Sequence, residues 1–155
     1  MSTNKRALLA SAAAILIAAA PTQLAAHGAS SAGEPGDPKK PARTVEVVMS
    51  EAQDGMHFTP DRVEVRPGEL IRFSIRNAGA VDHEFFLGTP QANKAHAEMM
   101  AAMPDMKHHD PNAVTVAPGA SAVLVWRFTH KGDFEFACLV PGHYESGMHG
   151  AVAVR

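Results

Sequence analysis

Residues 134–154 read FEFACLVPGHYESGMHGAVAV. The two ends of this stretch are short apolar runs, and the residues between them favour turns, which predicts two strands joined by a loop. The loop carries Cys138, the single cysteine of the chain, together with His143 and Met148. A thiol, an imidazole and a thioether in one loop form a soft set of ligands, which indicates a metal site.

Ligands of this softness suit copper. Two histidines and a cysteine in a plane, with a weakly bound axial methionine, form the ligand set of blue-copper centres. The second histidine has to come from another part of the chain, and the best candidate is His83 in the segment VDHEFF. Zinc is the alternative metal, because sets of cysteine and histidine also bind zinc.

The N-terminal residues 1–26 have the pattern of a secretory signal peptide. Lys5 and Arg6 precede an apolar run at 7–20, and small residues follow near Ala26. An uncleaved membrane anchor is the alternative, but the apolar run is shorter than a membrane span requires. The sequence therefore predicts export to the periplasm, with no stable membrane insertion after cleavage.

Charge and cysteine content limit the possible partners and chemistry of the exported chain. Cleavage removes two basic and no acidic residues, so the formal charge changes from −2 to about −4. An acidic chain without a basic stripe argues against nucleic-acid binding. A single cysteine cannot form an internal disulfide, and a bound metal would protect its thiolate in an oxidising compartment. A buried, inert cysteine is the alternative.

The exported chain is expected to divide into a short lead-in and one domain. Residues 27–42 are rich in Gly, Pro and Ser, which predicts a flexible segment without a fold of its own. If cleavage follows Ala26, His27 becomes the N-terminus and could chelate copper, although a solvated terminus is the favoured alternative. Residues 43–155 contain eight short apolar runs separated by turn signals, which predicts an all-β sandwich or barrel.

A segment rich in methionine and histidine interrupts this pattern. Helix-forming residues between 91 and 103 predict a short helical insertion that ends at Pro104. Seven soft-ligand side chains lie in and after it, and they are a possible auxiliary site for Cu(I), since thioethers select that ion. They are His96, Met99, Met100, Met103, Met106, His108 and His109. The alternative is that the methionines pack the helix onto the sheet.

Two motifs resemble the cupredoxins, the plastocyanin and azurin group of blue-copper proteins. One is FTPDRVEVRPGELIRFSIRNAGAVDHEFFL at residues 58–87, in which a histidine follows a strand that ends in Asn-Ala-Gly. The other is the loop at 134–154, with four residues between Cys and His and four between His and Met. This spacing is similar to that of rusticyanin and auracyanin. The resemblance extends over residues 45–154 and implies an eight-stranded Greek-key β-sandwich.

The resemblance also implies the ligands and one departure from the family pattern. By resemblance, His83, Cys138, His143 and Met148 bind one type 1 copper. Most plastocyanins and azurins have asparagine after the first histidine, whereas this chain has Glu84. A carboxylate there is expected to affect the potential and the copper affinity by changing the surroundings of the ligands.

Two functions follow from these expectations. The first is a monomeric periplasmic protein that carries single electrons through Cu(I)/Cu(II) between redox partners, such as a c-type cytochrome or a terminal reductase or oxidase. The alternative is a periplasmic copper-tolerance protein that sequesters copper at the cupredoxin site and at the auxiliary site. An enzyme is not expected, because four protein ligands leave no open position for a substrate.

Overall fold

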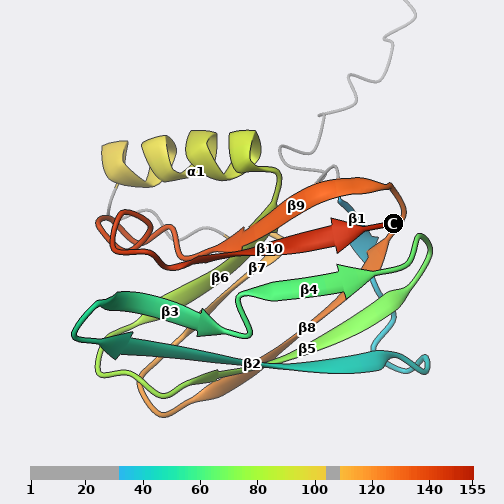
Figure 1. The fold of residues 1–155 in the computed structure, drawn as a ribbon, viewed down its shortest axis with the longest axis horizontal. Helices are drawn as coiled ribbons and strands as arrows, with labels where there is room; N and C mark the ends of the chain where they lie inside the picture. Colours follow the sequence, from blue (N-terminus) through green and yellow to red (C-terminus); the bar gives the residue numbers. More distant parts are fainter. Residues whose placement is uncertain (1–31, 104–108) are drawn as a thin grey trace, which may run out of the picture.

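Two β-sheets face each other in a computed structural model that describes residues 32–103 and 109–155 (Figure 1). The first sheet has the order β1-β8-β5-β2-β3. Its strands are β1 (Gly33–Pro35), β2 (Arg43–Ala52), β3 (Gly55–Thr59), β5 (Leu70–Asn77) and β8 (Ser121–Phe128). The pair β2–β5 is parallel, and the other neighbours in this sheet are antiparallel.

The second sheet has the order β4-β10-β9-β6-β7. Its strands are β4 (Arg62–Val65), β6 (His83–Gly88), β7 (Ala113–Val116), β9 (Gly132–Ala137) and β10 (His149–Val154). The pair β4–β10 is parallel, and the remaining pairs are antiparallel. The predicted all-β sandwich is therefore confirmed.

Aromatic rings fill the space between the sheets. Phe136 of the second sheet stacks on Phe85, with centroids 5.2 Å apart, and meets the edge of Phe58 from the first sheet at the same distance. Phe73 of the first sheet packs against Phe85 at 5.1 Å. Each fully buried Phe contributes on the order of 1.5–3 kcal/mol of hydrophobic free energy. Cys138 belongs to the same buried cluster, so the core supports the start of the loop at 138–148 directly.

One helix, α1 (Pro90–Ala102), interrupts the strands where the sequence predicts an insertion. It begins at Thr89, whose hydroxyl accepts a hydrogen bond of 3.1 Å from the backbone N–H of Ala92, and proline occupies the first helical turn. The helix lies against β6 and β9 on the outer side of the second sheet (Figure 1). No helix in the two described ranges is long and apolar enough to cross a membrane.

The structure corrects the predicted number of strands. The described residues form ten strands rather than eight, and the two additional ones are β1 and β3. Both are edge strands with weak strand signals, since β1 consists of Gly-Glu-Pro and β3 begins at Gly55. The expectation that residues 27–42 have no fold of their own is wrong for residues 33–35, which pair with β8. The predicted signal peptide and His27 lie outside the described residues.

Candidate metal centre

Three predicted ligands come from three separate places at one end of the sandwich. His83 is the first residue of β6, Cys138 follows the last residue of β9, and His143 lies in the loop that leads to β10. Strands β6 and β9 are antiparallel neighbours, with Phe86 opposite Ala137. This register brings the start of β6 next to the end of β9, so His83 and Cys138 meet although they are distant in sequence.

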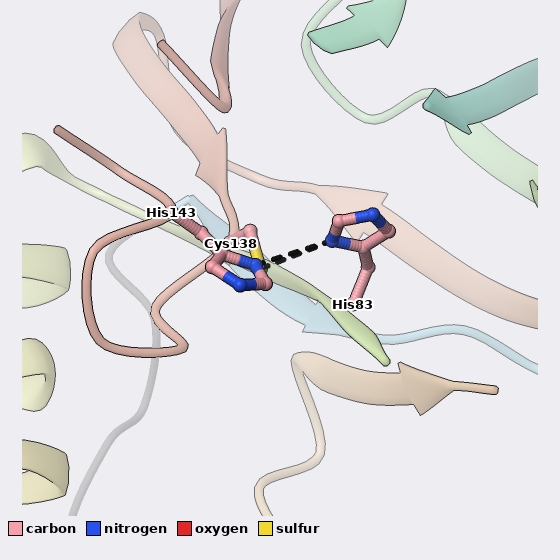
Figure 2. Close-up of side chains that lie close together, drawn as sticks. All are labelled: His83, Cys138 and His143. Carbon is pink, nitrogen blue, oxygen red and sulfur yellow. Dashed lines mark hydrogen bonds between the residues drawn. The ribbon is translucent and has the colours of Figure 1, made fainter. Parts of the chain in front are cut away.

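The ligand atoms of these three residues converge (Figure 2). The Nδ1 atoms of His83 and His143 are 3.2 Å apart, and the Sγ of Cys138 lies 3.3 Å from Nδ1 of His143 and 4.0 Å from Nδ1 of His83. All three atoms lie within 4.8 Å of one another, which is close enough for one ion to contact them all. A thiolate and two imidazoles form the donor set that copper prefers, so the residues fit this metal.

Backbone hydrogen bonds within the loop hold His143 and Met148 in place. The N–H of His143 donates to the carbonyl of Val140 at 3.0 Å, and the N–H of Met148 donates to the carbonyl of His143 at 3.1 Å. The N–H of Cys138 then donates to the carbonyl of Met148 at 3.0 Å, which closes the loop on itself. Gly142 has φ of 85°, a left-handed conformation that glycine adopts without strain.

Met148, the predicted axial ligand, is fully buried and belongs to the same apolar cluster as Cys138. Its backbone is tied to Cys138 and His143 by the hydrogen bonds of the loop. These contacts place the residue beside the three converging ligands. Coordination by its sulfur stays a prediction.

Burial shifts the pKa values of Cys138 and His143 in opposite directions. Burial raises the pKa of the Cys138 thiol to about 11, with the backbone N–H groups of Glu84 and Val140 opposing that shift and the Glu84 carboxyl adding to it. The thiol is therefore protonated at neutral pH without a cation. Burial lowers the pKa of His143, and the neighbouring His83 lowers it further. A neutral imidazole has a free lone pair for a metal.

Glu84 touches the site through its backbone and buries its carboxyl. Its backbone N–H donates to the Sγ of Cys138 at 3.3 Å, and the residue is 7% exposed. Burial raises the pKa of Glu84 to about 7, an effect that the backbone N–H of Leu139 opposes and the charge of Asp110 reinforces. The Oε2 atom has no hydrogen-bond partner among the described residues. The sequence predicts that Glu84 lies next to the metal site, but it does not predict that its carboxyl is buried.

Glu51 is a residue of the site that sequence reasoning missed. Its Oε1 lies 2.8 Å from Nε2 of His83, on the side of the ring opposite the converging ligand atoms. The backbone N–H of Ala80, followed by the imidazole of His83, lowers the pKa of this carboxyl, so it is ionised at neutral pH. Only the parallel register of β2 and β5, which pairs Met49 with Asn77, places Glu51 beside the loop before His83. No local motif signals that register.

The described residues of the predicted auxiliary site differ in their burial and contacts. His96 is buried, its ring stacks on Phe86 with centroids 4.3 Å apart, and its Nδ1 lies 3.7 Å from Asp110. These contacts favour a packing role for His96. Met99 and Met100 are half-buried, whereas Met103 and His109 are exposed. Met106 and His108 lie outside the described residues, and the auxiliary site stays a prediction.

The comparison with protein families agrees with this geometry. Residues 45–155 match the model of the copper binding proteins of the plastocyanin/azurin family. Among solved structures, the fold is similar to auracyanin B, with a TM-score of 0.64 and 25% sequence identity. That similarity covers 79% of this chain and 96% of auracyanin B.

Two relatives carry the same name. The chain is 58% identical over 123 residues to the copper-resistant cuproprotein CopI of Rubrivivax gelatinosus, a match that covers 79% of this chain and 73% of that protein. It is 36% identical over 170 residues to the copper-resistant cuproprotein CopI of Pseudomonas aeruginosa, with 91% of each chain covered. The family match spans most of the chain and includes the three converging side chains. This chain therefore belongs to the plastocyanin/azurin family of copper-binding proteins.

Proposed function

We propose that this protein protects the periplasm from copper by binding the ion at the site formed by His83, Cys138 and His143. The convergence of these three side chains within 4.8 Å carries the proposal, because it offers a soft and largely buried site for copper. Two relatives that share most of this chain are named copper-resistant cuproproteins, which supports tolerance over electron transport as the main role.

The chain's own residues account for the capture of copper. His83 and Cys138 are fully buried, whereas His143 is only half-buried, so the ion is expected to enter beside the His143 ring. The neutral imidazole of His143 is ready to bind, and the Cys138 thiol releases its proton when a cation arrives. Met148 would be the fourth residue to hold the ion. Because the ligands come from the sandwich core and from a loop closed by its own hydrogen bonds, the captured ion would be held firmly.

Location in the periplasm is part of this proposal. The pattern of residues 1–26 supports export, and the presence of one cysteine without a disulfide partner fits a thiol that a metal protects. We expect the protein to act as a binding protein rather than an enzyme, because two histidines, a cysteine and a methionine would leave no open position on the metal.

Growth of a copper-sensitive bacterial host tests the tolerance role. The wild-type chain should restore growth in copper, and Cys138→Ser should not, because it removes the thiolate ligand. His130→Ala is the matched control, since His130 is exposed and lies outside the site, and it should protect like the wild type. Equal protection by Cys138→Ser at equal protein levels would show that this site does not provide tolerance.

Electron transfer is the second candidate function, and one observation favours it. The half-buried His143 connects an otherwise buried set of ligands to the surface, which is a suitable exit for an electron. Copper bound there would supply the one-electron Cu(I)/Cu(II) couple. Rapid reduction of a c-type cytochrome by the Cu(I) protein, together with failure to protect the host, would favour this role. Slow electron exchange with the cytochrome, together with protection of the host from copper, would exclude the electron-transfer role.

A further inference from the structure

The carboxylate of Glu51 lies directly behind the His83 ring. Its Oε1 is 2.8 Å from Nε2 of His83, while Nδ1 of the same ring faces His143 at 3.2 Å. His83 is fully buried, and the Glu51 side chain is 27% exposed. One nitrogen of the imidazole therefore faces the metal site, and the other faces a carboxylate.

The loop before His83 is built around this carboxylate. The backbone N–H of Ala80 donates to both Glu51 oxygens, at 3.1 and 2.8 Å, and the N–H of Val81 donates to Oε1 at 3.3 Å. Gly79 packs on the same group, since a Cβ atom at this position would lie 2.3 Å from Oε1. Two backbone N–H groups and a close backbone contact therefore hold the carboxylate in place. A side chain that met His83 only by chance on the surface would not have these contacts.

This arrangement determines which tautomer His83 adopts. If Nδ1 offers its lone pair to the metal, the ring proton has to reside on Nε2 and is donated to Oε1 of Glu51. A carboxylate that accepts this hydrogen bond fixes the ring orientation and makes the imidazole a stronger electron donor. A stronger donor stabilises Cu(II) more than Cu(I), because the higher charge gains more from the added electron density.

We propose that Glu51 is a positioning residue that holds His83 in its metal-binding tautomer and biases the copper centre toward Cu(II). The inference rests on His83 being a copper ligand, but it is independent of the tolerance role. It predicts a lower reduction potential than the same four ligands would have without this carboxylate.

The substitution Glu51→Gln tests the proposal. It keeps the size of the side chain but removes the negative charge, so the affinity for Cu(II) should fall roughly 10–100-fold. The affinity for Cu(I) should fall less, and the reduction potential should therefore rise. Glu46→Gln is the matched control, because Glu46 is an exposed carboxylate on the same strand, and it should leave all three values unchanged.

Two further measurements keep the test decisive if Glu51→Gln folds poorly. Gly79→Ala leaves Glu51 in the chain but displaces its carboxylate, and the potential should rise in this variant too. Nitrogen NMR of the copper-free wild type should show the His83 proton on Nε2. The proposal would be overturned if Glu51→Gln and Gly79→Ala both kept the wild-type reduction potential. It would also be overturned if Glu51→Gln lost equal affinity for Cu(I) and Cu(II). Failure to protect a host from copper would overturn the tolerance role alone.

Discussion

The backbone N–H of Glu84 donates a hydrogen bond of 3.3 Å to the Sγ of Cys138, and the two residues are 54 positions apart in the chain. This contact joins the start of β6 to the end of β9, where the segments that carry His83 and Cys138 meet. The Glu84 side chain is buried, and its carboxyl lies near the backbone N–H of Leu139 and the charge of Asp110.

Glu84→Gln should stabilise the copper-free protein at pH 8 but not at pH 4. Burial raises the pKa of Glu84 from 4.5 to about 7, so the folded protein binds this proton more tightly than the unfolded chain does. The contribution of the group to stability is complete below pH 4.5 and is lost as the pH rises through 7. Ionisation should therefore cost roughly 3 kcal/mol above that range, and glutamine avoids the cost.

Urea unfolding at the two pH values measures this difference. Glu98→Gln serves as the control, because Glu98 is exposed on α1 and its substitution should have a small effect at both pH values. A difference between Glu84→Gln and the wild type that does not change with pH would contradict the prediction.

Copper binding should release a proton from Cys138. Because the pKa of this thiol is about 11 without the metal, the thiol is protonated at neutral pH and becomes a thiolate only when copper binds. The apparent affinity should then rise about tenfold for each pH unit between 7 and 9. Competition titrations with a chelator measure this slope, after correction for the chelator's own protonation. An affinity that does not change over this range would mean that the thiol is not the titrating ligand.

Met148→Leu should retain copper and raise the reduction potential. Leucine has a similar volume and is apolar, so the buried position is conserved, but the weak axial donor to Cu(II) is lost. Spectroelectrochemical titration of the variant against the wild type measures the shift. Leu139→Met is the matched control for a similar volume change at a buried position near the site, and it should shift the potential little. An unchanged potential in Met148→Leu would show that Met148 is not the axial ligand.

The methionines of the helical segment should decide whether a second copper binds. If Met99, Met100 and Met103 belong to an auxiliary site, the wild type should bind more than one Cu(I) per chain. Changing all three to leucine should reduce the stoichiometry to one, while the packing of the helix is largely kept. Metal analysis after equilibration with Cu(I) measures this ratio. If the wild type and the triple variant each bind one copper per chain, these methionines serve only to pack the helix.

The sequence allowed prediction of those features that depend on local residue patterns. The ligand loop, His83 after its strand and the insertion helix all have such patterns, and each lies within a few residues of its predicted place. The role of Glu51 was not predictable, because it follows from the parallel register of β2 and β5 and from the course of the loop around Gly79. Strands β1 and β3 were missed because edge strands with glycine carry little alternation.

The absorption spectrum during titration with Cu(II) tests the central claim most directly. Coordination of copper by the Cys138 thiolate and two imidazoles predicts an intense visible band that grows up to one equivalent of copper. The band should be absent in Cys138→Ser and retained in His130→Ala. A colourless complex with one copper per chain, or a band that survives the loss of Cys138, would contradict the assignment of this site as a type 1 copper centre.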